Sequence, residues 1–311
     1  MGVVLAGAIW LLSFNAQAQS AQKITLSHDG IDRTVHVYLP EKRPDKLALI
    51  VALHGYGSSA ENIMAYSGLN ALAERHGYIV AYPQGTLDEE QNTFFNVGYE
   101  FHAESNIDDI GFIRKTVSHL VSLHPINPGQ IFATGMSNGG DMSYLLGCQA
   151  ADLFNVIAPV AGTMMVSNAD DCRPSEPVSV LAISGTSDNV TWFSGDLENA
   201  GGWGAYLGVD AVVELWAGRL PGSPNEKSKT IEYANDNPVH VRTYGSDDGI
   251  EQVVLYRVEQ GGHDWPSARF KWWDIRRFFA LYAMGFGEHQ GLDASSEIVG
   301  FFNRFRGTQR P

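Results

Sequence analysis

Strand-like and helix-like patterns alternate along nearly the whole chain, and this alternation limits the possible folds more than any other feature. The run at 47–53, LALIVAL, is apolar at every position and has the length of one strand. A continuously apolar run of that length suits a strand buried on both faces. Helical stripes separate the successive runs, as the crossovers between parallel strands require. The pattern predicts an α/β fold with a mostly parallel central sheet and helices on both faces.

The expected elements can be placed by their residue ranges. Strands are predicted at 24–26, 34–39, 47–53, 78–82, 130–134, 155–160, 178–183 and 251–258, the first two as an antiparallel hairpin,. Helices are predicted from the capping pattern Ser58-x-x-Glu61 to Gly77, from Asp108 or Asp109 to the turn before Pro125, from 141 onward, over 209–220, and from Asp293 to Phe302,. No linker interrupts the alternation, so we expect residues 19–311 to form a single domain.

Residues 135–139 carry the sharpest chemical signal. Their sequence, GMSNG, matches the G-x-S-x-G pattern of a nucleophile elbow, with a strand-like segment before it and a helix-like segment after it,. In such a turn the serine is strained, and the flanking glycines leave room for the backbone. The first amides of the following helix favour developing negative charge. An ordinary glycine-rich connection is the alternative. The context favours Ser137 as a nucleophile.

A second glycine-rich segment, HGYG at 54–57, follows the buried strand at 47–53 directly. Such a loop can fold over a reaction site and present a backbone N–H to an oxyanion. We assign the two oxyanion donors to the amides of Tyr56 and Asn138. For the imidazole of His54, a structural role in pinning the loop is favoured over a direct chemical one.

An acid and a base are expected at strand ends after the serine. Asp188 ends the segment SGTSD, which follows the predicted strand 178–183, and His263 follows two glycines that let its loop reach the serine. His240 is expected on a strand face and His289 in a surface loop. Asp264 is a rival acid, but adjacent side chains seldom lie in one plane. The chain order Ser137, Asp188, His263 is that of the α/β-hydrolases.

The N-terminus and the cysteines indicate export. An apolar run at 3–14 is followed by Ala16-Gln17-Ala18, so residues 1–18 are predicted to be a signal peptide,. The chain has two cysteines, Cys148 and Cys172. An even count in an exported protein favours a disulfide, with two free thiols as the alternative. We therefore expect a secreted protein, extracellular or periplasmic.

The charge balance excludes some partners. Lys and Arg number 21 and Asp and Glu number 35, a net charge of −14. A protein that binds nucleic acids or anionic membranes needs a basic face. We therefore expect no nucleic acid as a partner, and no membrane after the signal peptide is cleaved. No cofactor is expected, and no metal, because no Cys or His pair has ligand spacing.

The chain resembles the secreted poly(3-hydroxybutyrate) depolymerase and feruloyl esterase family of α/β-hydrolases. The resemblance rests on LHGYG at 53–57, YPQG at 82–85, DDIGFI at 108–113, TGMSNGGDM at 134–142, APVAG at 158–162, SGTSD at 184–188, GGHDWP at 261–266 and DASSEIVGFF at 293–302. It implies one α/β-hydrolase catalytic domain, a nucleophile at Ser137, an acid at Asp188, a base at His263, and a Cys148–Cys172 bridge. Two segments depart from the pattern: 191–208, and the aromatic insertion in 267–292.

The implied function is a secreted serine esterase. We expect action on poly- or oligo-(3-hydroxybutyrate), with a feruloyl or acetyl-xylan carbohydrate esterase as the alternative. Met136, Trp192, Phe193 and Trp265 are predicted to line an apolar substrate pocket. A peptidase or dienelactone-type hydrolase on the same fold, and a non-catalytic polymer-binding protein, are the remaining rivals. The aromatic pair Trp272-Trp273 is expected either to contact polymer or to pack into the protein's own core.

Overall fold

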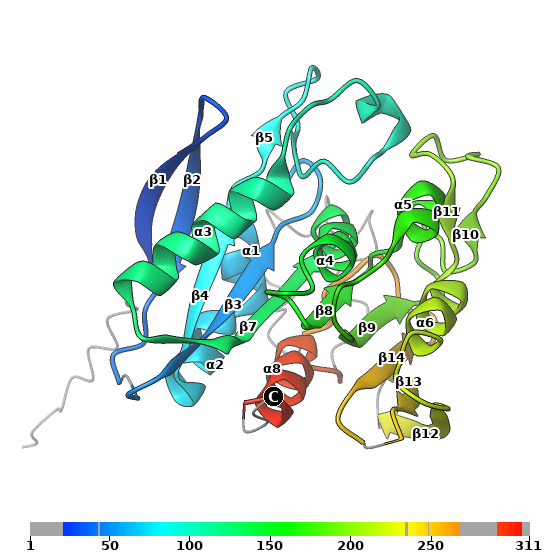
Figure 1. Ribbon diagram of the computed structural model, residues 1–311. Helices are drawn as coiled ribbons and strands as arrows, with labels where there is room; N and C mark the ends of the chain where they lie inside the picture. The colour runs from blue at the N-terminus through cyan, green and yellow to red at the C-terminus, as the bar shows by residue number, and fades with distance from the viewer. Residues whose placement is uncertain (1–20, 43, 234–235, 248, 268–290, 307–311) are drawn as a thin grey trace, which may run out of the picture.

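The computed structural model describes residues 21–42, 44–233, 236–247, 249–267 and 291–306 (Figure 1). The strands are β1 Gln22–His28, β2 Ile31–Tyr38, β3 Leu47–Leu53, β4 Tyr78–Pro83, β5 Thr86–Leu87, β6 Thr93–Phe94, β7 Ile126–Met136, β8 Val156–Val160, β9 Ser179–Gly185, β10 Gly195–Asp196, β11 Tyr206–Leu207, β12 Asn225–Tyr233, β13 Asp236–Gly245 and β14 Gln252–Val258. The helices are α1 Ala60–Ser67, α2 Leu69–His76, α3 Asp109–Leu123, α4 Asn138–Gln149, α5 Val166–Asp171, α6 Val209–Ala217 and α8 Ala294–Arg304, with a 3₁₀ turn η1 at Glu100–His102.

The described strands build a ten-stranded sheet in the order β1-β2-β4-β3-β7-β8-β9-β14-β13-β12. Its six central strands, β4 to β14 in that order, are all parallel. Antiparallel hairpins, β1–β2 and β12–β13, extend the two edges. The predicted mostly parallel sheet and the leading hairpin are confirmed. Because the central strands run the same way, their carboxyl ends all lie along one edge of the sheet.

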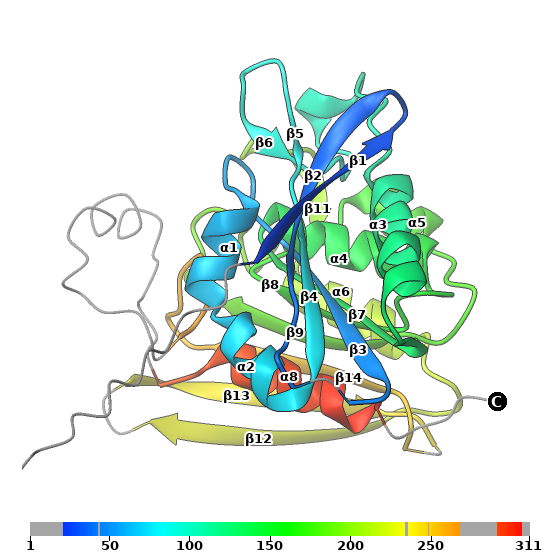
Figure 2. The same ribbon diagram turned by 90° about the vertical axis from the view of Figure 1, so that its left-hand side faces the viewer.

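Helices cover both faces of the sheet, as predicted. Helices α3, α4 and α6 pack on one face, and α1, α2 and α8 pack on the other (Figures 1 and 2). Strand β3 is buried along its whole length. This explains why its sequence is continuously apolar, since both faces of the strand meet a helix layer.

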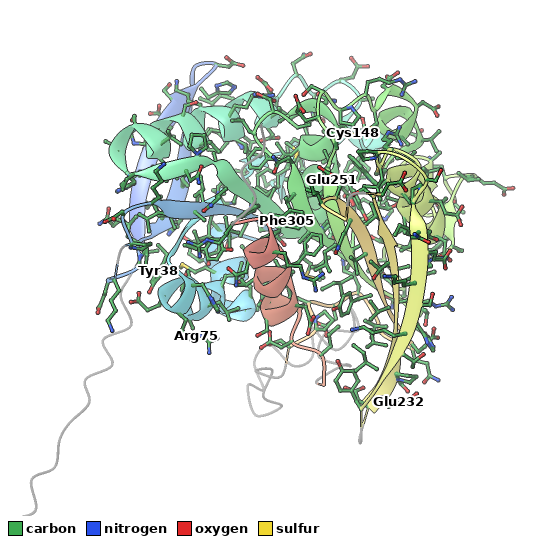
Figure 3. All side chains as sticks on the ribbon, turned by 60° about the horizontal axis from the view of Figure 1, so that its bottom comes forward. Tyr38, Arg75, Cys148, Glu232, Glu251 and Phe305 are labelled. Carbon is green, nitrogen blue, oxygen red and sulfur yellow. A yellow bond between two sulfur atoms is a disulfide. The ribbon has the colours of Figure 1, made fainter. Side chains whose placement is uncertain are left out.

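Two features of the fold correct the sequence-based prediction. The helix predicted from the Ser58 pattern to Gly77 is two helices, because Gly68 adopts φ 60° between α1 and α2. Its N-cap is Ser59, whose hydroxyl accepts from the amide of Asn62. The strand β12 was not predicted. Its residues are mostly exposed at the sheet edge (Figure 3), so its sequence shows no apolar face.

The structure contains the Cys148–Cys172 disulfide, with Cα atoms 5.0 Å apart. The bond joins the carboxyl-terminal turn of α4 to the end of α5. The predicted pairing is therefore confirmed. Every helix in the described ranges is too short or too polar to cross a membrane. The predicted signal peptide and the aromatic part of the insertion, including Trp272 and Trp273, lie outside the described residues.

Candidate active site

Ser137 lies in a strained turn between β7 and α4. Its backbone has φ 56° and ψ −123°, a conformation that residues with a Cβ rarely adopt,. The turn is held because the amide of Ser137 donates to the carbonyl of Val160, 2.9 Å away, and its carbonyl accepts from Asp141. Strain of this kind costs about 1–3 kcal/mol and occurs mostly at functional sites. The geometry is that of the predicted nucleophile elbow.

The glycines of the motif are required by close backbone contacts. A Cβ on Gly135 would lie 2.3 Å from the carbonyl oxygen of Gly139. A Cβ on Gly139 would lie 2.1 Å from the carbonyl oxygen of Leu53, at the end of β3. Both distances are far below van der Waals contact. The G-x-S-x-G spacing thus lets the elbow sit directly against the neighbouring strand.

Asp188 and His263 form a buried pair. His263 Nδ1 lies 2.8 Å from Asp188 Oδ2. The other carboxylate oxygen of Asp188 accepts from the amides of Val190 and Thr191, each at 2.8 Å. These three contacts fix the orientation of both side chains. With Nδ1 donating to Asp188, the second ring nitrogen, Nε2, carries the lone pair that a general base uses.

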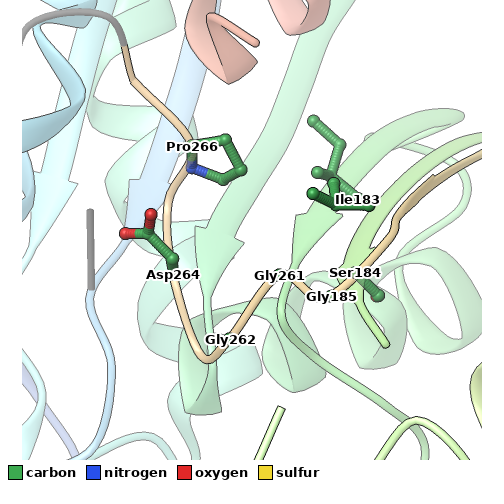
Figure 4. Close-up of a pocket in the computed structure, with 8 residues that line it drawn as sticks. Ile183, Ser184, Gly185, Gly261, Gly262, Asp264 and Pro266 are labelled. Carbon is green, nitrogen blue, oxygen red and sulfur yellow. The ribbon is translucent and has the colours of Figure 1, made fainter. Parts of the chain in front are cut away.

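Backbone contacts between two loops place this pair. The loops follow β9 and β14, which are parallel neighbours in the sheet. The amide of Ser187 donates to the carbonyl of Gly261 at 2.9 Å, and a Cβ on Gly185 would lie 2.2 Å from that same oxygen. Gly185 and Gly261 therefore permit the contact between the loops. The rival acid Asp264 directs its carboxyl group to the opposite side of its loop from Ser184 and Gly185 (Figure 4).

The loop at 54–57 lies against the elbow. A Cβ on Gly55 would approach the Cβ of Ser137 to 3.3 Å. His54 Nε2 accepts from the amide of Gly85 at 2.9 Å, which leaves Nδ1 to donate to the carbonyl of Gly55. Burial lowers the pKa of His54 to about 4, so the imidazole is neutral. His54 thus pins the loop that carries Tyr56, as the sequence analysis favoured.

Asn138 has a structural role that the sequence analysis missed. Its side chain accepts from the amide of Phe95 at 2.8 Å and donates to the carbonyl of Phe95 at 2.9 Å. This pair of hydrogen bonds ties the elbow to the segment after β6. As the first residue of α4, Asn138 has a backbone amide without a partner within the helix,. Its amide is thus available for the predicted oxyanion role.

A small pocket opens beside Ser137. It is lined by Tyr99, Ser137, Asp141, Thr163, Met165, Val190, Thr191, Trp203 and Tyr206. The centre of a water-sized sphere can occupy only about 10 Å³ of it. The pocket therefore admits a group about the size of one water molecule or methyl group,. Most of its wall comes from segments far from Ser137 in the sequence.

None of the four predicted pocket residues is among those that line this pocket. Met136 is 2% exposed and belongs to the core on the α1, α2 and α8 face. Trp265 is also buried, and its indole donates to the hydroxyl of Ser295 at 3.0 Å. Phe193 packs against the other core, beneath the guanidinium of Arg257. Trp192 is 36% exposed, and its amide donates to the hydroxyl of Tyr206.

Asp141 is the functional candidate that the sequence analysis overlooked. It lies one helical turn after Ser137, lines the same pocket and is 6% exposed. Burial raises the pKa of its carboxyl to about 7, against hydrogen bonds from Thr163 and Tyr99 that act to lower it. The charges of His263 and Asp188 also act on this pKa, so all three groups share one site. The sequence signal that could have identified it is an acidic residue four positions after the nucleophile, one helical turn away.

One group of side chains in the described residues could face a metal ion together: His28, Asp29 and Asp108. Asp108 is the N-cap of α3, and His28 Nε2 lies 3.2 Å from Asp108 Oδ2. None of the three lines the pocket beside Ser137. They have structural contacts to each other and to the helix, so they give no reason to invoke a metal in the reaction.

The fold and the site define the class of protein. A parallel sheet between two helix layers, with a strained serine after one strand and an Asp–His pair after two others, has the architecture of an α/β-hydrolase. A solved acetyl xylan esterase from Aspergillus awamori shares this fold, with a TM-score of 0.59 and 16% identity over 78% of this chain and 94% of that one.

Sequence comparisons then give the family. The model of the family described as "Esterase PHB depolymerase" matches residues 34–213, so the chain belongs to this family. A relative named "Putative esterase NocK", from Nocardia uniformis subsp. tsuyamanensis, is 30% identical over 75% of this chain and 68% of its own length. Feruloyl esterase B of Piromyces equi is 28% identical over 75% of this chain. Poly(3-hydroxyalkanoate) depolymerase C of Paucimonas lemoignei is 26% identical over 74%.

The protein is therefore an enzyme, a serine hydrolase that acts on carboxylic esters. The matched region spans 43% of the feruloyl esterase and 58% of the depolymerase.

Proposed function

We propose that this enzyme hydrolyses short-acyl, uncharged esters through an acyl-enzyme on Ser137, and that it prefers 3-hydroxybutyrate-type esters to feruloyl esters. The observation that carries the mechanism is the 2.8 Å contact between His263 Nδ1 and Asp188 Oδ2, at the sheet edge where Ser137 is held in its strained turn. Asp188 orients the imidazole, and Nε2 of His263 takes the proton of the Ser137 hydroxyl.

In the first half of the reaction, Ser137 Oγ attacks the ester carbonyl. The amides of Tyr56 and Asn138 donate to the oxyanion, and each such donor contributes about 2.7–4 kcal/mol to transition-state stabilisation. The imidazolium of His263 returns its proton to the alcohol, which leaves as the acyl–oxygen bond breaks. Water then attacks the acyl-enzyme by the reverse sequence, and the acid is released with Ser137 restored.

The small pocket supports the choice of substrate. The space beside Ser137 suits a methyl-sized or hydroxymethyl-sized group better than the flat aromatic ring of a ferulate. The net charge of −14 would repel an acidic product and so favour its release,. The Paucimonas depolymerase and the Piromyces feruloyl esterase are both relatives, so the family alone does not decide between the two substrates.

The test is a comparison of kcat/KM for a 3-hydroxybutyrate trimer and for methyl ferulate, with Ser137→Ala as the control for background hydrolysis. We expect the trimer to be favoured. A value for methyl ferulate that exceeds that for the trimer by tenfold or more would reverse the substrate assignment. Loss of activity toward both esters in Ser137→Ala is expected from the mechanism.

We also propose that the enzyme is exported. The apolar run at 3–14, followed by Ala16-Gln17-Ala18, supports a signal peptide cleaved after Ala18,. The Cys148–Cys172 bond supports an oxidising compartment,. N-terminal sequencing of the protein recovered from the culture medium or periplasm should begin at Gln19. A mature protein that retains residues 1–18 would contradict this.

A further inference from the structure

Asp141 presents a buried carboxyl group to the pocket beside the nucleophile. Its oxygen Oδ1 accepts from the amide of Thr163 at 2.7 Å, and Oδ2 accepts from the hydroxyl of Tyr99 at 2.7 Å. A carboxylate has about four lone-pair positions, two on each oxygen. With two described donors, the Asp141 carboxylate can still accept further hydrogen bonds. A further donor can reach it from the pocket beside Ser137, which Asp141 lines.

The walls of the pocket differ in chemistry. Met165, Val190 and the indole of Trp203 supply apolar surface, whereas Asp141 and the phenols of Tyr99 and Tyr206 supply polar atoms. The hydroxyl of Thr163 is already used, because it donates to the carbonyl of Leu207. A purely hydrocarbon group would leave the two described hydrogen bonds of Asp141 in place but would give its remaining acceptor positions no donor, and this is unfavourable,. A small group with one hydroxyl would satisfy both walls.

Charge limits the choice further. Asp141 and Asp188 both act on this site, and their carboxyl groups disfavour a further acidic group from the substrate,. The occupant should therefore be uncharged, short, and able to donate one hydrogen bond. A β-hydroxyacyl group has these properties, since it carries a hydroxyl two carbons from the reacting carbonyl. A simple butyryl group lacks the donor, and a succinyl group brings a carboxylate.

We propose that Asp141 is a specificity residue, which accepts a hydrogen bond from the hydroxyl of a short hydroxyacyl group while Ser137 attacks the carbonyl of that group. This inference rests on the proposed function and adds to it the residue that distinguishes a hydroxyacyl group from a plain acyl group of the same length.

The test uses four ethyl esters with the same leaving group: the (R) and (S) enantiomers of ethyl 3-hydroxybutyrate, ethyl butyrate, and monoethyl succinate. Acid release is followed by titration at a constant pH above 7, where the Asp141 carboxyl group is mostly ionised. In the wild-type enzyme, we expect kcat/KM for one hydroxybutyrate enantiomer to exceed that for butyrate by about 10-fold to 100-fold, the range of a hydrogen bond to a charged group. Monoethyl succinate should be the poorest substrate.

The variant Asp141→Asn removes the charge and one acceptor oxygen, and it should reduce the hydroxybutyrate-to-butyrate ratio to below about threefold. The matched control is Asp196→Asn. Asp196 is also a buried aspartate and accepts from the amides of Ala200 and Gly201, but it does not line this pocket. Its substitution should leave the ratio unchanged.

The outcomes separate this inference from the proposed function. If the wild-type enzyme hydrolyses butyrate and hydroxybutyrate equally, or if Asp141→Asn keeps the full preference, the role of Asp141 is wrong while the esterase mechanism stands. If Asp141→Asn fails to fold, the absence of a hydroxyl preference in the wild-type enzyme still refutes the inference. If the wild-type enzyme hydrolyses none of these esters but hydrolyses methyl ferulate, the proposed substrate preference falls together with this inference, and the Ser137 mechanism stands.

Discussion

The strain at Ser137 can be measured by comparing alanine and glycine at this position. Alanine retains a Cβ and therefore the strained conformation, φ 56° and ψ −123°. Glycine releases the strain, worth about 1–3 kcal/mol. Glycine also raises the entropy of the unfolded chain, which lowers the free energy of unfolding by about 0.4–1 kcal/mol. Ser137→Gly should therefore have a free energy of unfolding roughly 0–2.5 kcal/mol above that of Ser137→Ala.

The assay is denaturant and thermal unfolding of the two variants. A difference near the middle of that range corresponds to a Tm about 2 °C higher for Ser137→Gly, given an unfolding entropy of about 2.1 cal/mol/K per residue over a domain of about 290 residues,. Ala103→Gly is the matched control, since Ala103 is exposed and has φ −56°. The same change at Ala103 should destabilise by about 0.5–1 kcal/mol.

Both substitutions at Ser137 should abolish ester hydrolysis. Loss of the nucleophile cost about 10⁶ in turnover in another serine hydrolase. A Ser137→Gly protein that is less stable than Ser137→Ala, by as much as at Ala103, would refute the argument that the turn is strained. More than a few per cent of residual activity in Ser137→Ala would remove Ser137 from the nucleophile role.

Three further predictions follow from the same contacts. Asp188→Asn should lower kcat severely but less than Ser137→Ala, and Asp264→Asn only slightly; the reverse order would make Asp264 the acid. Reduction of Cys148–Cys172, which are 24 residues apart, should remove about 3.5 kcal/mol of stability and lower the Tm, while activity at 25 °C persists; an unchanged Tm would contradict this,. The pKa of Asp141 in the folded state, about 7, exceeds its value near 4 in the unfolded state, so between these pH values the folded state binds more protons,. The free energy of unfolding should therefore fall as pH rises from about 4 to 7. Urea unfolding at several pH values should show this decrease in the free energy of unfolding, at most about 4 kcal/mol, and the decrease should be smaller in Asp141→Asn.

The central sheet and the elbow could be predicted from the sequence because both restrict which residue types can occupy particular positions. Strand β3 is apolar throughout since both its faces are covered. Gly135 and Gly139 appear at fixed positions because any side chain there would collide with backbone oxygens. Such constraints act on single positions, and a single sequence records them. The edge strand β12 leaves no such mark because most of its residues face solvent.

The acid and base were predicted from chain order, and their contact depends on long-range packing. Asp188 and His263 are 75 residues apart, yet their loops meet because β9 and β14 are neighbours in the sheet. The glycines at 185 and 261 are a local trace of this, since they allow the two backbones to touch. The strand order itself is fixed by the packing of whole layers.

The four predicted substrate-binding residues are absent from the lining of the pocket beside Ser137 for a geometrical reason. Proximity to Ser137 in the sequence does not mean proximity to the pocket, because successive side chains of a strand point to opposite faces. Met136, next to the serine, packs into the core, whereas Asp141 returns to the site after one turn of α4. Trp203 reaches the same pocket from the loop between β10 and β11. The elbow thus sets the chemistry locally, while specificity is built from distant segments whose meeting requires the whole fold.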